Sequence, residues 1–456
     1  MDYLLKRDAP FAPESKRLFR GLLDNLFSSQ KRRHPKSLAG NKKVYHLQGK
    51  SIDTYPSKQV INEMVVAVEG MVNIVELHFE WRDLPLNKDT EMFLTSTRTF
   101  FDESLRKLVL QAQINKFKEL LAISNFANLT EIDFHFDYQP EVGKVVPEAQ
   151  GLMETILPFI QHRRTMLRSL SVSSSSTVDL SNFFSALPSM PSLRQFDIDL
   201  DFEKDHLSDP SGILNILIHH SHTLFHVQFR VASSSVPTHN QNPALRKRKN
   251  WESVNDRLLA NPSCLNGLIS LEIPYISLMK TIPLVRRSSD SLTKLCLTGY
   301  FLSSNEVSAV VDLFYSRPFE LQHLHLQVDQ LRCSLLQLLS CRLPNLYSLV
   351  LVYRICYGPP DEVSLALDDT LHPSADTFSK LISTQKKNFL PFKDWKLEDI
   401  GIYEGRYRPS QIEALQMSHS SFNTEYQLMQ TVSRAVPSIT RWKGFRQEHW
   451  SKFEGP

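Results

Sequence analysis

Apolar residues recur along this chain in a six-residue pattern, L-x-x-L-x-L, in which Ile, Val or Phe also fills the apolar positions. The last two apolar positions are two residues apart, a spacing that places both side chains on one face of a β-strand. The pattern therefore predicts a short strand at each copy. Degenerate copies occur at Val44-Leu47 and Ile439-Trp442. The clear copies are Ile74-Leu77-Phe79, Leu105-Leu108-Leu110, Leu129-Ile132-Phe134, Leu167-Leu170-Val172, Leu193-Phe196-Ile198, Leu224-Val227-Phe229, Leu268-Leu271-Ile273, Leu292-Leu295-Leu297, Leu321-Leu324-Leu326, Leu346-Leu349-Leu351 and Leu397-Ile400-Ile402.

The spacing of the copies is typical of one repeat class. Copies that start at 105 and 129 are 24 residues apart, and those that start at 167 and 193 are 26 apart. Leucine-rich repeats have a period of about 20–29 residues. Between the copies the apolar positions follow a helical spacing, which predicts helices over residues 115–126, 151–167 and 305–315. Each repeat is therefore expected to be a strand followed by a helix.

These repeats predict an α/β leucine-rich-repeat solenoid with irregular repeats, because one strand and one helix bury their apolar faces only by stacking on neighbours. We expect a curved horseshoe with short parallel strands on its concave face and helices on its convex face. The alternative is a leucine-rich helical protein, but a helix does not repeatedly place aromatic residues two apart, as at Phe134 and Phe136. The predicted domains are an N-terminal segment with a capping helix (residues 1–40), the solenoid (residues 41–445) with insertions at 232–250 and 357–390, and a tail (residues 446–456).

Charge and composition narrow the functional classes. The formal net charge is only +3, so the whole chain has no strong attraction to nucleic acid or to an anionic membrane. No stretch approaches the ~20 apolar residues that cross a bilayer, and the start of the chain lacks the apolar core of a signal peptide. The 5 cysteines form no C-x-x-C pair, which favours reduced thiols in a cytoplasmic or nuclear protein. We expect protein partners, no membrane, and no nucleic-acid partner.

The sequence carries none of the common catalytic or cofactor motifs. With 14 glycines in the chain, there is little room for phosphate-binding loops, and the sequence has no G-x-S-x-G, H-E-x-x-H or G-x-x-x-x-G-K-[ST] motif. His219, His220 and His222 cluster near His226, and His323 alternates with His325, but no Cys or carboxylate completes a metal site at a recognised spacing. We therefore expect no enzyme activity, no cofactor and no metal.

Four segments are distinctive: Leu187-Pro-Ser-Met-Pro-Ser-Leu193, Arg342-Leu-Pro-Asn-Leu346, Ile439-Thr-Arg-Trp442 and residues 18–28. The first three resemble the leucine-rich regions of fungal F-box proteins, and residues 18–28 resemble the helix that follows the F-box in those proteins. No L-P-x-E-like start of an F-box precedes that helix. The resemblance implies a substrate receptor that binds a protein target and passes it, through a Skp-type adaptor, to a cullin ubiquitin ligase.

The x positions of each copy are expected to point out from the concave face, where a partner binds. They are acidic in the early copies and mixed or basic in the later ones. Either these side chains form a recognition surface that orients a partner, or they are polar only because water wets them. The candidate partner-binding residues are Glu76, Glu80, Glu131, Asp133, Asp197, Asp199, His226, Arg230, His323 and His325.

A basic run interrupts the period inside the first insertion. Arg246, Lys247, Arg248 and Lys249 are consecutive cations that follow a loop-like segment. Such a run is typical of nuclear-import signals and of phosphate contacts, and also of solvated loops. It supports an alternative function, a nuclear or RNA-associated scaffold that contacts phosphates through this loop.

Overall fold

The structure is a computed structural model of the whole chain. It describes residues 2–5, 43–46, 58–69, 74–81, 87–122, 126–137, 148–176, 178–200, 207–231, 249–315, 321–356, 392, 394–405, 422–442 and 445–446. The chain comprises two compact units, Met1–Leu224 (unit 1) and Phe225–Pro456 (unit 2). The prediction of one continuous solenoid across residues 41–445 stays a prediction.

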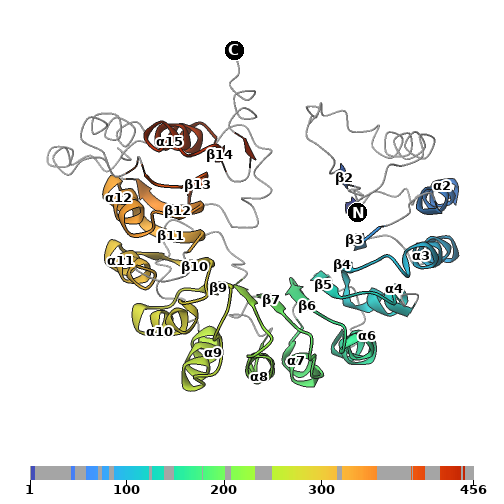
Figure 1. Cartoon of the computed structure of the whole chain (residues 1–456). Coiled ribbons are helices and arrows are strands. Elements are labelled where there is room, and N and C mark those ends of the chain that lie inside the picture. The colour runs from blue at the N-terminus through green and yellow to red at the C-terminus, as the bar shows by residue number, and fades with distance from the viewer. Residues whose placement is uncertain are drawn as a thin grey trace, which may run out of the picture. The chain divides into compact units, whose positions relative to one another are not determined.

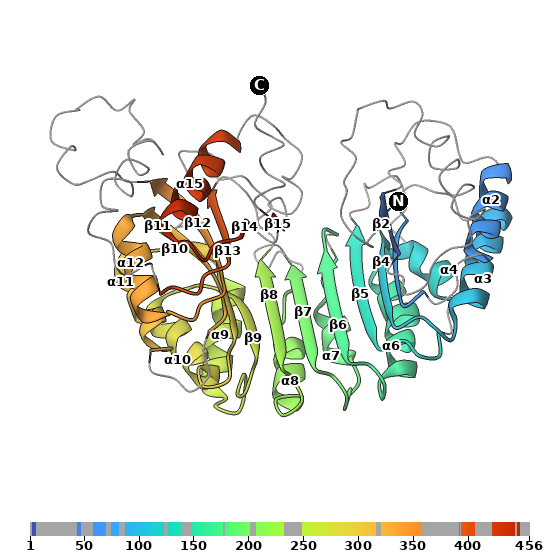
Figure 2. The same cartoon turned by 45° about the horizontal axis from the view of Figure 1, so that its top comes forward.

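Unit 1 contains five parallel strands in chain order, with helices between them (Figures 1 and 2). The strands are β3 (Glu76–Trp81), β4 (Lys107–Gln113), β5 (Glu131–Asp137), β6 (Ser169–Ser174) and β7 (Gln195–Leu200). The helices are α2 (Lys58–Glu69), α3 (Lys88–Phe101), α4 (Phe117–Ala122), α5 (Glu148–Gly151), α6 (Leu157–Arg163), α7 (Ser181–Ala186) and α8 (Ser211–His219), with a 3-10 turn at Ile114–Lys116 and a π-helical turn at Leu152–Ile156.

Unit 2 continues the same alternation of strand and helix. Its strands β8 (His226–Val231), β9 (Ser270–Pro274), β10 (Lys294–Leu302), β11 (His323–Leu331), β12 (Ser348–Cys356), β13 (Asp399–Glu404) and β14 (Arg441–Trp442) are parallel, and β15 (Phe445–Arg446) pairs antiparallel with β14. Its helices are α9 (Lys249–Ala260), α10 (Leu278–Ser288), α11 (Ser304–Asp312), α12 (Cys333–Arg342) and α15 (Phe422–Ala435). The expected α/β class, with parallel strands, alternating helices and a solenoid-like arrangement, is confirmed.

Each of the eleven clear copies of the sequence pattern coincides with one of the strands β3 to β13, and the degenerate copy at Ile439-Trp442 contains β14. Along each strand, the apolar positions alternate with the polar ones. In β11, for example, Leu324 and Leu326 are buried, whereas His323 and His325 are half-buried on the other face. Helices cover one side of the strands of each unit (Figure 1), and the buried strand residues pack against them, as Phe79 of β3 does against Phe93 of α3. Burial of these leucines, worth roughly 1.5–3 kcal/mol each, holds helix and strand together.

The register of the sheets is fixed by a repeated backbone contact. In successive repeats, the carbonyl oxygen just before one strand accepts two N–H groups of the next repeat. The carbonyl of Arg106 accepts from Thr130 and Glu131, both at 2.9 Å, and the carbonyl of Ile269 accepts from Thr293 at 2.9 Å and Lys294 at 3.1 Å. This contact starts every ladder at the same position of the repeat. Equivalent side chains of neighbouring strands therefore lie side by side.

Some predicted elements differ from the structure. The helix expected over 115–126 is a 3-10 turn followed by α4, which ends at Ala122. The helix expected over 151–167 becomes α5, a π-helical turn and α6, which ends at Arg163. Pro158 in the first turn of α6 has no N–H to donate to the carbonyl of Glu154, so the helix widens before it. The helix expected over 305–315 is α11.

The ends of the chain and the two insertions are described only in small part. Lys43–His46 forms strand β2, near the degenerate copy Val44-Leu47, but it pairs antiparallel with β1 (Asp2–Leu5) and not with the parallel strands. The predicted helix at 18–28, the insertion at 357–390, residues 232–248 and the tail after Arg446 lie outside the described residues. Among the described helices, none is long and apolar enough to cross a membrane.

Candidate functional site: the polar faces of the strands

The face of each sheet that turns away from the helices carries the polar x positions of the repeats. In unit 1 these positions form rows across the strands, because the pairing is in register. One row contains Glu76, Lys107, Glu131, Ser169 and Gln195. The next row contains His78, Val109, Asp133, Ser171 and Asp197, and the third contains Glu80, Gln111, His135, Ser173 and Asp199. We call this surface the polar face of unit 1.

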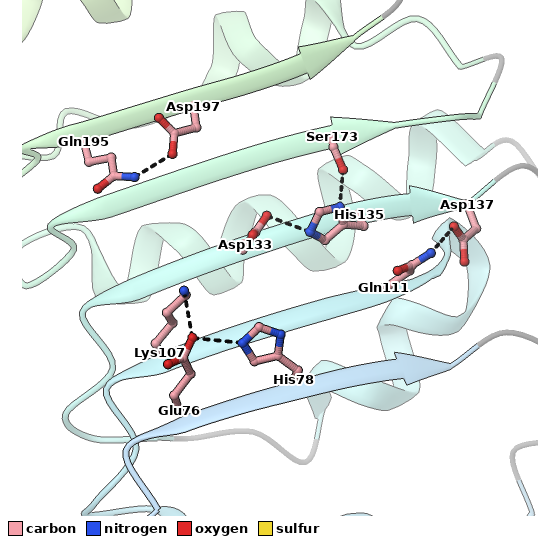
Figure 3. A network of polar contacts seen from close by, with 10 residues as sticks. All are labelled: Glu76, His78, Lys107, Gln111, Asp133, His135, Asp137, Ser173, Gln195 and Asp197. Carbon is pink, nitrogen blue, oxygen red and sulfur yellow. Dashed lines mark hydrogen bonds and ion pairs between the residues drawn. The ribbon is translucent and has the colours of Figure 1, made fainter. Parts of the chain in front are cut away.

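An ion pair fixes the first row. The Nζ atom of Lys107 lies 2.8 Å from Oε1 of Glu76, and Nε2 of His78 lies 2.9 Å from the same oxygen (Figure 3). Burial lowers the pKa of Lys107, but the hydrogen bond and negative charge of Glu76, together with the charges of Glu131 and Asp133, raise the pKa overall above its ordinary value. Glu76 is only 8% exposed. It acts here mainly as the partner of Lys107, with little surface left for another molecule.

The centre of this face is a chain of three polar side chains. The Nε2 atom of His135 lies 3.1 Å from Oδ1 of Asp133, and the hydroxyl of Ser173 is hydrogen-bonded to Nδ1 of His135 (Figure 3). Although burial lowers the pKa of His135, the hydrogen bond to Asp133 and the charges of Asp133, Asp137 and Asp199 raise it overall. Burial raises the pKa of Asp133, but contacts with His135 and Ser171 lower it overall. The carboxylate is thus kept ionised beside an imidazole that holds its proton more tightly than usual.

Other acids of unit 1 are also held in place. Gln111 donates to Asp137 at 2.9 Å, and Gln195 donates to Asp197 at 2.6 Å (Figure 3). Of the candidate residues in this unit, Glu80 is buried, and Glu131, Asp133, Asp197 and Asp199 are half-buried. The structure brings all six candidates of unit 1 onto one face.

The polar face of unit 2 has, near its start, a charge pair in which the carboxylate is buried and the guanidinium is partly exposed. The Nε atom of Arg230 donates to Oε1 of Glu272 at 2.7 Å, and the Nη2 atom of Arg230 donates to Oε2 at 3.4 Å. Glu272 is only 4% exposed. Its neighbour Cys296 on β10 is buried, and burial, together with the nearby Glu272, raises the pKa of the thiol well above its ordinary value. This thiol is therefore protonated and unreactive at neutral pH.

The remaining candidates of unit 2 lie on β8 and β11. His226 and His323 belong to one row, and His325 lies in the next row, paired in register with Cys296. Burial lowers the pKa of His226 and of His323, and the positive charge of Lys294 lowers both further. Arg246, Lys247 and Arg248 lie outside the described residues, and Lys249 is the first residue of α9.

His219, His220 and His222 cluster in the sequence as candidate metal ligands. His220 is buried on the helical side of unit 1, where burial and then the charge of His219 lower its pKa to about 4. Its Nε2 atom accepts a hydrogen bond from the backbone of Met190 at 3.4 Å. Within the described residues, no group of three His, Cys, Asp or Glu side chains is arranged to hold a metal ion. All 5 cysteines are free thiols.

Sequence reasoning missed three members of these networks: Lys107, Ser173 and Glu272. Lys107 and Glu272 occupy x positions of their own copies, and Ser173 continues the alternation directly after its copy, so the signal was present. Their partners are 31, 38 and 42 residues away in sequence, and the ion pairs become visible only when the strands are aligned in register.

No protein-family model matches the sequence, and no curated protein is significantly similar to it.

Proposed function

We propose that this chain is a leucine-rich-repeat solenoid that binds a protein target along the polar faces of its strands and carries out no chemistry of its own. One observation supports this proposal most: every described parallel strand presents its polar residues to the same side, opposite the helices of its own unit. A sheet face of this kind is wide and continuous, as protein partners require.

The acidic side chains on the polar face of unit 1 are better explained by binding of a partner than by contact with water alone. Asp133, Asp137 and Asp197 each accept a contact from a neighbouring side chain, so their positions are set before a partner arrives. Binding to a preorganised surface loses less side-chain entropy than binding to a mobile one. Glu131 and Asp199 add to the negative charge of the same face. The partner segment that best fits unit 1 is therefore basic, and opposite charge speeds its encounter.

An enzymatic role for the same residues is less well supported. Ser173, His135 and Asp133 follow the order hydroxyl, imidazole, carboxylate that hydrolases use. Acyl transfer also needs N–H donors for the developing oxyanion. The backbone of β5 and β6 around these residues is engaged in the parallel ladder, so its N–H groups do not point at the face. A fixed polar contact surface remains the better interpretation.

The resemblance to fungal F-box proteins extends the proposal. In that class the repeats bind the target and the N-terminal segment binds a Skp-type adaptor, which recruits a cullin. We therefore propose that this chain is a substrate receptor in ubiquitin-dependent degradation. Affinity capture with the full chain and with residues 41–456 tests this step. Recovery of adaptor and cullin with the full chain alone supports it, and their absence from both captures contradicts it.

The binding function itself is tested by charge reversal on the polar face. Asp197→Lys with Asp199→Lys removes negative charge from β7, and the matched control is Glu103→Lys with Glu154→Lys, at exposed positions away from the strands. We expect the first pair to abolish capture of the target and the control pair to retain it, with both proteins folded. Equal capture by both proteins would contradict an acidic recognition face. Capture of RNA that weakens steeply with salt would instead favour the scaffold function of residues 246–249.

A further inference from the structure

A row of four hydrogen-bond donors crosses consecutive strands of unit 2. His226 on β8 pairs in register with Ser270 on β9, Ser270 pairs with Lys294 on β10, and Lys294 pairs with His323 on β11. Because neighbouring strands lie about 4.8 Å apart, the four side chains share about 14 Å of one face. None of the four positions holds a carboxylate.

These donors are not engaged with other side chains of the described residues. Lys294 is exposed, and His226, Ser270 and His323 are half-buried. Within the described part of the chain, none of the four side chains takes part in a hydrogen bond or an ion pair. His323 packs edge to face against the ring of Tyr347, with centroids 5.7 Å apart.

The other charges of this face are arranged differently, because most of them are paired. Arg230 is paired with Glu272, Arg354 with Asp329, and Arg441 lies 3.6 Å from Glu398. Asp399 lies further along the same row, between Ser348 and Arg441, and accepts a hydrogen bond from Ser348 at 3.3 Å. The charge of Lys294 is thus the least compensated on the row.

The charge of Lys294 also affects the pKa of the two neighbouring histidines, His226 and His323. Burial lowers the pKa of His226, and Lys294 lowers it further. Burial and Lys294 also lower the pKa of His323, where Asp399 opposes the shift and Arg441 adds to it. An anion bound beside Lys294 would relieve this repulsion, so it would be held by more than one group.

We infer that this row is an oxyanion-binding site, with Lys294 as the central cation and with Ser270, His226 and His323 as hydrogen-bond donors to a phosphate group. An ammonium group offers three donors, and a hydroxyl and a neutral imidazole offer one each, which suits the several acceptor oxygens of a phosphate. The inference rests on the proposed function only for the carrier of the phosphate, which is the bound protein target.

The test uses the full chain and inorganic phosphate, titrated by calorimetry at constant ionic strength. We expect Lys294→Gln to weaken phosphate binding by at least about tenfold, which corresponds to ~1.4 kcal/mol. The matched control is Lys280→Gln on α10, because Lys280 is paired with Asp256 at 2.8 Å and lies on a helix. The control should bind phosphate as the unaltered chain does.

A second readout follows the ring resonances of His226 and His323 by NMR, assigned with His→Gln variants. Phosphate should raise the pKa of both histidines, and Lys294→Gln should remove most of that rise. Absent binding, equal loss in both lysine variants, or unchanged histidine pKa values would overturn the site. Neither measurement needs a protein target, so failure here is distinct from failure of the charge-reversal capture experiment.

Discussion

The imidazole Nε2 of His135 lies 3.1 Å from the carboxylate Oδ1 of Asp133, two positions earlier on the same strand. The contact joins two x positions of one repeat, and Ser173 of the next repeat holds the other ring nitrogen. Side-chain contacts along one strand and across to the next thus fix the charged groups of the polar face of unit 1.

This pair gives stability a defined pH dependence. The folded-state pKa of Asp133 is lowered, so its contribution is present above its unfolded pKa and lost as pH falls through the folded value. The folded-state pKa of His135 is raised, so its contribution is full below its unfolded pKa and lost as pH rises through the folded value.

We expect Asp133→Asn to cost up to about 1 kcal/mol of unfolding free energy at about pH 5.5, because both groups are partly exposed, and less at about pH 9. Denaturant unfolding at several pH values measures this. Glu103→Gln serves as the control, and a pH-independent loss with Asp133→Asn would contradict the assignment.

Arg287 caps the helix of the preceding repeat. Its guanidinium donates to the carbonyl oxygens of Leu258 and Leu259, both at 2.8 Å, and of Asn261 at 2.9 Å. These carbonyls lie at or just beyond the end of α9, where they have few helical N–H partners. We expect Arg287→Met to lower the unfolding free energy by about 2–3 kcal/mol. Arg286→Met, one residue earlier and exposed, should change it by less than about 0.5 kcal/mol. Similar effects of the two substitutions in denaturant melts would show that the cap contributes little.

Gly212, in the first turn of α8, lies close to the backbone of α7. A Cβ at this position would lie 2.4 Å from the backbone nitrogen of Ser185 and 2.5 Å from the carbonyl carbon of Phe184. Backbone atoms cannot move aside as a flexible side chain does, so Gly212→Ala should lower the unfolding free energy by about 1–3 kcal/mol. Gly151→Ala is the comparison, because its nearest atom is a side-chain methyl of Ile114 at 3.3 Å. Thermal melts in which both alanines are tolerated equally would contradict the close packing.

Much of the fold could be predicted from the sequence. The L-x-x-L-x-L pattern located every strand from β3 to β13, because alternate burial demands apolar residues two apart, as at Leu324 and Leu326. The ends of the helices could not be predicted as well from the sequence. The break before α6 depends on Pro158, whose effect on the preceding turn cannot be read from apolar spacing alone.

The candidate site was predictable only as a surface. The candidate residues of unit 1 lie together on one face of the strands, but Glu76 and Glu80, which were expected to contact a partner, are buried, in the case of Glu76 against Lys107. Such pairs depend on which residues of different repeats meet in register. That register is set by the backbone contacts before each strand, which leave no trace in residue type.

The two faces of a strand should respond oppositely to the same substitution. Leu324 is 2% exposed in the middle of β11, so Leu324→Asp places a charge in the apolar layer and should leave the protein insoluble. Gln327, on the polar face of the same strand, should accept Gln327→Asp with soluble expression and a cooperative melt. A soluble, cooperatively melting Leu324→Asp protein would show that the register is wrong.

Site-specific photo-crosslinking can show directly whether a protein partner binds on the polar face of the strands. A photoreactive amino acid replaces Ser171, on the polar face of unit 1, or Arg164, exposed at the C-terminal end of α6. We expect one strong crosslinked protein from position 171 that the Asp197→Lys and Asp199→Lys substitutions remove, and none from position 164. Crosslinking from position 164 alone, or equally from both positions, would contradict binding on this face.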